Sequence, residues 1–202
     1  MSFLLFVIVK SSIPLPSPFP ASEKRQLEFA AGRRCAQQAL EKLHLSGEVG
    51  VGAKREPVWP QGAVGSIAHT FSRGEEGWAG AVVGYASAYR SLGFDMEAVL
   101  SDKRAQNLQH RIFCPGEAER LKGEMRLGLL TTIVFSAKES LYKALFPLVR
   151  EFFDFHDAEV LTLDGPQFKI ALRRDLGEFT AGSAFDGRYW LEGKLVHTMV
   201  SL

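Results

Sequence analysis

The chain has 202 residues and a formal net charge of +1, with 46% hydrophobic and 23% charged residues. This composition is that of an ordinary soluble globular protein, and its near-neutral charge gives no global field that would attract nucleic acid or a membrane surface. The two cysteines, Cys35 and Cys114, lack the spacing of a zinc site or a disulfide framework. We therefore expect a cytoplasmic protein whose partners include neither nucleic acid nor a membrane, and we also expect it to be a monomer.

The first element expected is a buried strand over the apolar residues Ser2–Val9. A secretory signal is the alternative, but no Lys or Arg precedes this stretch and a proline-rich run follows it at once. Because proline fixes φ and lacks an amide donor, residues 14–20 are predicted to form an extended connector. No apolar run in the sequence approaches the length needed to cross a bilayer.

The rest of the first half is predicted to contain one helix and two strands. Apolar residues recur at helical spacing from Ser22, a good N-cap residue, to about His44. Residues 46–64 are rich in glycine and proline and are predicted to form a loop with short extended pieces. Trp78–Tyr85 and Ser91–Glu97 are rich in β-forming residues and predict consecutive strands.

The second half is predicted to repeat this order, with helices first and strands after them. Residues 101–126 form a charged helical region, and a strong helix runs from about Leu130 to Phe146, where Pro147 is expected to stop it. Turn signals such as Asp-Gly separate four further strands, Ala158–Leu163, Phe168–Leu172, Arg188–Glu192 and Leu195–Val200. The fold class is therefore α+β, with a largely antiparallel C-terminal sheet.

Asp95 and Glu97 are candidates for a metal site. They lie two residues apart in a predicted strand, which places both carboxylates on one face. Magnesium commonly takes one or two carboxylates together with substrate phosphates. The alternative is two solvated acids on the exposed face of an edge strand, and the pair alone does not decide between them.

Glu139 and Lys143 form a second candidate pair. On the predicted helix they are four residues apart and project from the same face, while Ala137, Leu141 and Ala144 mark an apolar stripe toward the core. The polar pair either lines a cleft or is an ordinary surface pair worth roughly 0.3–0.5 kcal/mol. Helical spacing alone favours the surface pair.

Two segments of the chain resemble the signature motifs of the 4′-phosphopantetheinyl transferase superfamily. The segment Gly93-Phe94-Asp95-Met96-Glu97 resembles the Gly-Ile-Asp-Ile/Val-Glu motif. The segment Phe135-Ser136-Ala137-Lys138-Glu139-Ser140-Leu141-Tyr142-Lys143-Ala144 resembles the Trp/Phe-Ser-x-Lys-Glu-Ser/Ala-x-x-Lys-Ala motif. Phe94 and Met96 depart from the aliphatic residues that are usual there.

Further blocks of the sequence are similar to the surfactin/enterobactin-synthase type of this superfamily. They are Glu28–Ala36, Arg55–Pro60 and Gly65–Thr70, although Ala68 and Thr70 stand where serines are common. The resemblance implies two similar α/β halves in a pseudo-twofold arrangement, divided as residues 1–90 and 91–202, with coenzyme A in the cleft between them.

The resemblance also implies roles for the two candidate pairs. Asp95 and Glu97 would bind magnesium together with the diphosphate of coenzyme A. Glu139 would be a third metal ligand or the base that activates the acceptor serine. Lys143 would contact the phosphates and assist the departure of 3′,5′-ADP, as a mobile ammonium group can.

Three more residues match positions that contact coenzyme A in the family. His69 is expected to hold the 3′-phosphate, and Arg33 and Arg55 the adenosine phosphates, which suit guanidinium forks. Lys138 is a further phosphate candidate. The alternatives from the residues themselves are a structural histidine, surface arginines and a solvated lysine.

The implied reaction transfers 4′-phosphopantetheine from coenzyme A to a serine of an acyl or peptidyl carrier protein, giving holo-carrier protein and 3′,5′-ADP. Carrier proteins are acidic near this serine, and residues 103–126 supply six basic side chains for docking. Interleaved acids make a solvated mixed-charge helix the alternative for this region. Alternatives for the function are a non-catalytic carrier-binding protein and another magnesium-dependent phosphotransferase.

Overall fold

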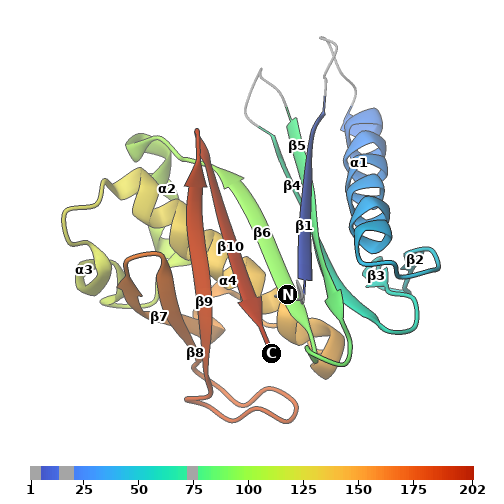
Figure 1. Cartoon of the computed structure of the whole chain (residues 1–202). Helices are drawn as coiled ribbons and strands as arrows, with labels where there is room; N and C mark the ends of the chain where they lie inside the picture. Colours follow the sequence, from blue (N-terminus) through green and yellow to red (C-terminus); the bar gives the residue numbers. More distant parts are fainter. Residues whose placement is uncertain (1–5, 14–20, 72–76) are drawn as a thin grey trace.

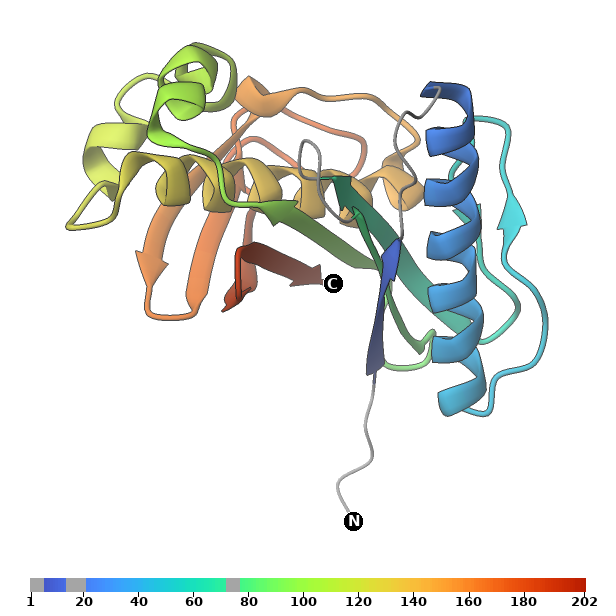
Figure 2. The ribbon, with the colours of Figure 1, turned by 90° about the horizontal axis from the view of Figure 1, so that it is seen from above.

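Two antiparallel sheets lie between two long helices in the computed structural model of the chain (Figures 1 and 2). The structure describes residues 6–13, 21–71 and 77–202. The helices are α1 (Ala21–Lys42), α2 (Asp102–Ile112), α3 (Glu117–Leu121) and α4 (Leu127–Val149). The strands are β1 (Phe6–Ile13), β2 (Gly50–Val51), β3 (Pro57–Val58), β4 (Ala63–Phe71), β5 (Gly77–Tyr85), β6 (Leu92–Ala98), β7 (Ala158–Asp164), β8 (Gln167–Leu172), β9 (Ala184–Glu192) and β10 (Leu195–Ser201).

The longer strands form two sheets, which we call the first and the second sheet. The first sheet has the order β1-β5-β4 and the second the order β6-β10-β9-β8-β7, with antiparallel neighbours throughout. Strands β2 and β3 form a separate short pair. The α+β fold class with antiparallel sheets packed against helices is therefore confirmed. The division at residue 90 and the pseudo-twofold relation stay predictions.

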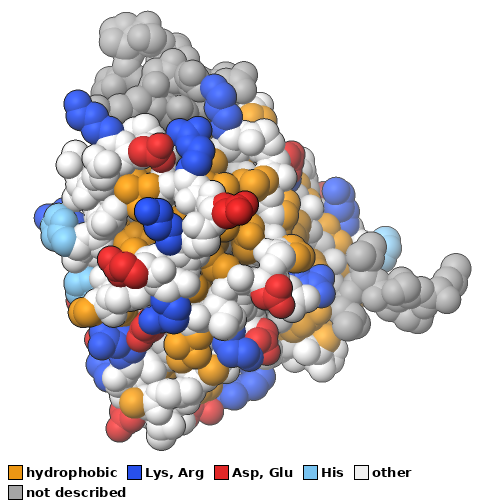
Figure 3. All heavy atoms as spheres, turned by 90° about the vertical axis from the view of Figure 1, so that its left-hand side faces the viewer, with side chains coloured by type: hydrophobic (Ala, Val, Ile, Leu, Met, Phe, Trp, Pro, Cys, Tyr) orange, Lys and Arg blue, Asp and Glu red, His pale blue; other side chains and the backbone are white. Residues whose placement is uncertain are grey.

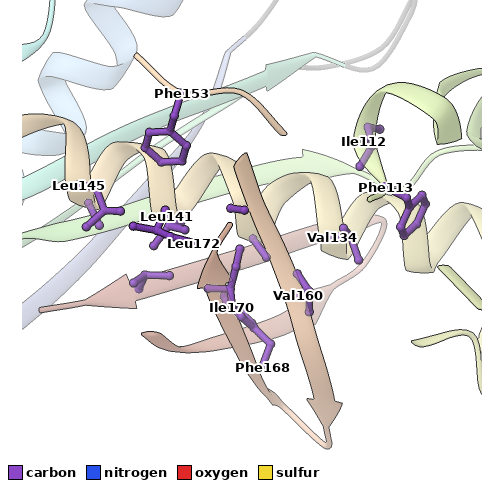
Figure 4. Close-up of a cluster of buried hydrophobic side chains, with 14 of the residues drawn as sticks. Ile112, Phe113, Val134, Leu141, Leu145, Phe153, Val160, Phe168, Ile170 and Leu172 are labelled. Atoms are coloured by element: carbon purple, nitrogen blue, oxygen red, sulfur yellow. The ribbon is translucent and has the colours of Figure 1, made fainter. Parts of the chain in front are cut away.

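Three hydrophobic clusters hold these layers together. The first packs α1, with Cys35 and Leu40, on the first sheet. The second packs α4 on the second sheet, and Figure 4 shows Leu141 pointing toward Ile170 there. The third, which includes Val82 and Phe94, lies between the two sheets. This third cluster is a separate hydrophobic core that joins the first sheet to the second.

Several predicted boundaries differ from the structure. Helix α4 continues through Pro147 to Val149, so the predicted stop is wrong. A proline in the last turn removes one amide that would bond the carbonyl four residues back, which a helix tolerates near its end. The charged region 101–126 divides into α2 and α3. Strand β1 reaches Ile13, and the predicted connector over 14–20 lies outside the described residues.

Gly93 allows α4 to approach β6 closely. A Cβ at this position would lie 1.8 Å from the carbonyl oxygen of Ser140. Gly93→Ala is therefore expected to force the helix off the strand and to lower the free energy of unfolding by roughly 1–3 kcal/mol. Urea unfolding would measure this loss, and an unchanged midpoint would contradict the close approach. Gly165→Ala would not serve as a control for this variant, because Gly165 has a positive φ, which alanine rarely adopts.

His197 lies in the core between the sheets and is 0% exposed. Its ring stacks on Phe94 and Trp190, and among the described residues neither ring nitrogen has a hydrogen-bond partner. The nearest carboxylate oxygen, on Glu192, is 3.7 Å from Nε2. Burial, together with the charge of Lys10, lowers the pKa of His197 to about 4.

This lowered pKa predicts a loss of stability in acid. The folded state favours neutral His197, so its contribution is complete above the unfolded-state pKa near 6.5 and is lost as the pH falls toward about 4. Urea unfolding at about pH 7.5 and about pH 5 should show this loss. His197→Phe, which keeps a flat ring, should show a smaller loss, and an equal loss would contradict the assignment.

Candidate active site

Helix α4 holds the Asp95 carboxylate of β6 at both of its oxygens. Lys143 Nζ lies 2.6 Å from Asp95 Oδ1, and Ser136 Oγ donates to Asp95 Oδ2 at 2.8 Å. Asp95 is only 3% exposed. The two motifs recognised in the sequence therefore meet in space, and the Asp95–Lys143 ion pair joins them.

Glu97 lies on the same face of β6, beyond Asp95. The hydroxyl of Thr70, near the end of β4, donates to Glu97 Oε2 at 2.7 Å. Burial, then the charge of Asp95 and to a lesser extent that of Glu139, raises the pKa of Glu97 to about 7, although Thr70 and Lys143 oppose this shift. Such perturbed carboxyl groups are typical of functional sites.

Glu139 and Lys143 complete the cluster from consecutive turns of α4. Burial raises the pKa of Glu139, and Asp95 adds to this while Lys143 opposes it. Burial by itself lowers the pKa of Lys143, but the attraction of Asp95, Glu139 and Glu97 outweighs it and raises the pKa above its usual value. Asp95, Glu97, Glu139 and Lys143 therefore act electrostatically on one another, and we call them the acidic cluster.

Two adjoining pockets open beside the acidic cluster. The Lys143 pocket, of about 380 Å³, is lined by Lys54, Arg55, Trp59, Tyr142, Lys143 and Phe146 among others. The His69 pocket, also about 380 Å³, is lined by Arg25, Phe29, Arg33, Arg55, Pro57 and His69 among others. Arg55, Pro57 and Ile67 line both. The structure thus brings three predicted cationic or basic residues, Arg33, Arg55 and His69, around one pocket next to Lys143.

The basic side chains around the His69 pocket differ in exposure and in the partners they already have, and therefore in how available they are to bind an anion. His69 Nδ1 is 3.9 Å from Glu28 Oε1. Burial lowers the pKa of His69, and Glu28 partly offsets this. Arg33 Nη1 donates to the carbonyl oxygens of Val49 and Gly50 at 2.8 and 2.5 Å, so this nitrogen is already hydrogen-bonded within the protein. Arg55 is exposed.

Lys138 takes a different place from the one predicted. Its ammonium group lies 2.7 Å from Glu117 Oε2 and donates to the carbonyl oxygens of Ile112 and Phe155 at 2.8 and 2.9 Å. The Lys138 side chain is 1% exposed and that of Glu117 is 0% exposed. The structure therefore gives Lys138 an interior ion pair, and it supports neither a phosphate contact nor a solvated lysine.

The acidic cluster has the donor chemistry of a magnesium site without its geometry. Carboxylate oxygens are ligands that magnesium prefers. Burial first, and then the like charges of Asp95 and Glu139, raise the pKa of Glu97, and a bound cation would relieve the like-charge part. Within residues 6–13, 21–71 and 77–202, however, no three His, Cys, Asp or Glu side chains are arranged to hold a metal ion. One oxygen of Asp95 already pairs with Lys143.

The six basic residues predicted for carrier docking lie on exposed positions of α2, α3 and the segments that follow them. They are Lys103, Arg104, Arg111, Arg120, Lys122 and Arg126. Arg120 pairs with Glu159 at 2.6 Å and Arg126 with Asp102 at 3.2 Å. Figure 3 shows basic and acidic side chains interspersed on the face that carries α2 and α3. The surface therefore has the mixed charge of the alternative prediction.

Sequence reasoning missed the hydroxyl groups that orient the acidic cluster. Thr198, opposite Asp95 on β10, exchanges hydrogen bonds with Ser136 and Ser140 at 2.8 and 2.7 Å. Thr70, noted only as a departure from the family pattern, binds Glu97. Ser136 and Ser140 stand in the recognised motif, which could have drawn attention to them. Thr198 gives no such local signal.

The fold and the site define an α+β protein whose acidic cluster adjoins a pocket lined from both halves of the chain, by Arg55 and Lys143 among others. Residues 19–84 match the family model of the 4'-phosphopantetheinyl transferase N-terminal domain, and residues 91–192 match that of the 4'-phosphopantetheinyl transferase superfamily. The chain belongs to the 4'-phosphopantetheinyl transferase superfamily. None of the helices in the described part of the chain has the length and hydropathy to span a membrane.

Curated relatives agree with this assignment. The chain is 37% identical over 153 residues to 4'-phosphopantetheinyl transferase PptT of Mycobacterium tuberculosis, which covers 73% of this chain and 64% of that protein. It is 31% identical over 182 residues to enterobactin synthase component D of Salmonella typhi, covering 90% of this chain and 74% of that protein. The matched part thus spans less than two thirds of the length of the first of these relatives.

Proposed function

We propose that this protein transfers the 4′-phosphopantetheine group of coenzyme A to a serine of an acyl or peptidyl carrier protein. The products would be holo-carrier protein and 3′,5′-ADP. The observation that carries the proposal is the position of the acidic cluster beside two pockets lined by Lys143, Arg55 and His69. Lys143 contacts Asp95 and also lines the first of these pockets, so it links the carboxylates of the acidic cluster to the basic groups that could bind phosphates.

The side chains suggest a division of labour in this reaction. His69, Arg33 and Arg55 would bind the phosphates of the adenosine end, while Lys143 would neutralise charge that develops on the leaving diphosphate oxygen. Glu139 would accept the proton of the attacking serine. Asp95, Glu97 and Glu139 are the carboxylates that would hold magnesium once they moved together, since the described residues do not bring three such groups into metal-binding geometry. A cation held there would supply further positive charge at the diphosphate.

The assay incubates the purified chain with coenzyme A, magnesium and apo carrier proteins of fatty-acid, polyketide, peptide and siderophore synthesis. Intact-mass measurement should show the phosphopantetheine adduct on at least one carrier, and a chelator should abolish it. The absence of an adduct on every carrier would contradict the proposal. Carrier binding without modification would favour the non-catalytic alternative, and cleavage of coenzyme A without transfer would favour a hydrolase.

A further inference from the structure

A tight turn over residues 52–56 carries Arg55 to the place where the Lys143 pocket and the His69 pocket adjoin. Gly52 N donates to Glu56 O and Arg55 N donates to Gly52 O, each at 2.9 Å. Arg55 has a φ of 67°, a left-handed conformation that residues other than glycine rarely adopt. Contacts elsewhere in the turn have to maintain this conformation.

The Glu56 carboxylate supplies such contacts. Its Oε2 accepts a hydrogen bond from Lys54 N at 2.9 Å, and its Oε1 accepts one from Arg150 Nη1. A Cβ at position 52 would lie 2.3 Å from Glu56 Cδ, so the carboxylate folds over the turn only because residue 52 is glycine. Glu56 thus closes the turn and ties it to Arg150 at once.

Arg150 in turn belongs to the helix of the acidic cluster. It caps the C-terminus of α4, where its N–H donates to Phe146 O at 2.9 Å. Its carbonyl oxygen accepts a hydrogen bond from Lys54 Nζ at 3.2 Å. The turn that presents Arg55 is therefore fastened to the end of the helix that presents Lys143, across the pocket that both residues line.

We infer that Glu56 and Arg150 are positioning residues that hold the Arg55 guanidinium at the junction of the two pockets and thereby set the affinity for the phosphates of coenzyme A. This inference rests on the proposed function. The ion pair itself is partly exposed, with side chains 16% and 58% accessible, and contributes little to stability in such a setting. Its effect is on where Arg55 lies. Glu56 also lines the Lys143 pocket, but its carboxylate would repel a phosphate, so Arg55 is the side chain of these three that would bind the ligand.

Two variants disturb the Glu56 carboxylate in different ways. Glu56→Gln removes its charge, and Gly52→Ala moves it by the clash of the new Cβ without a positive φ to strain the backbone. Each is expected to raise the Kd for coenzyme A, measured by calorimetry, about threefold to tenfold, while kcat at saturating coenzyme A changes less than about twofold. Glu178→Gln is the matched control, because its ion pair with Arg90 lines neither pocket.

A double-mutant cycle then tests whether Glu56 acts through Arg55. If it does, Arg55→Gln weakens binding, and adding Glu56→Gln to that variant has little further effect. Unchanged Kd values in Glu56→Gln and Gly52→Ala would overturn the inference, as would losses that add in full or an unaffected Arg55→Gln. These results leave the proposed function standing, whereas wild-type protein that neither binds coenzyme A nor modifies a carrier would overturn both.

Discussion

Lys138→Met is expected to lower the free energy of unfolding by roughly 3–5 kcal/mol, because it leaves the Glu117 carboxylate buried without its counter-ion. Within the part of the chain that the structure describes, Glu117 would keep only the N–H groups of Cys114 and Val160, at 2.7 and 2.6 Å. The contact with Val160 ties α3 to β7, but neither contact neutralises the charge. Urea unfolding followed by tryptophan fluorescence would measure the loss.

Two controls separate a buried charge from a lost contact. The double variant Lys138→Met with Glu117→Gln leaves no unpaired charge and should therefore lose less stability than Lys138→Met alone. Lys169→Met breaks an ion pair with Asp186 whose side chains are 45% and 84% exposed, so it should cost less than about 1 kcal/mol. If Lys138→Met matched that surface variant, the interior ion pair would have no structural role.

Much of the fold could be predicted because long elements carry a clear period. The helix over 22–44 and the strands Trp78–Tyr85 and Ser91–Glu97 correspond to α1, β5 and β6 within a few residues. The end of α4 could not be predicted from Pro147, because a proline in a last turn removes only one hydrogen bond. The last residue of a helix or strand depends on one or two local hydrogen bonds, whereas the hydrophobic period of a buried face extends over the whole element.

The site shows where spacing alone fails. Lys138 and Lys143 stand in one helical motif, yet one ammonium group is buried beside Glu117 and the other meets Asp95 beside a pocket. The choice depends on which element packs on each side of α4, and no local pattern in the sequence contains that information. The resemblance to the family placed Asp95 and Lys143 in one site, but the phosphate contact expected for Lys138 does not match its interior ion pair with Glu117.

Glu139→Gln is expected to reduce kcat for phosphopantetheine transfer by about 10²- to 10⁴-fold, because an amide of the same shape cannot take the serine proton. The hydrogen bonds that hold α4 to the second sheet come from Ser136, Ser140 and Lys143, so the fold should remain. Turnover is read by intact mass of the carrier, and the unfolding midpoint checks the fold.

The same variant distinguishes the two roles open to Glu139. If the carboxylate only helps to hold magnesium, a large excess of the metal should restore part of the rate in Glu139→Gln, because binding then limits turnover. If it accepts the proton, saturating metal restores nothing, since the lost step follows binding. Glu119→Gln, on an exposed position of α3, should leave the rate unchanged. Near-normal turnover of Glu139→Gln would exclude both roles and move the chemistry to Glu97, the other carboxyl group with a raised pKa beside Asp95.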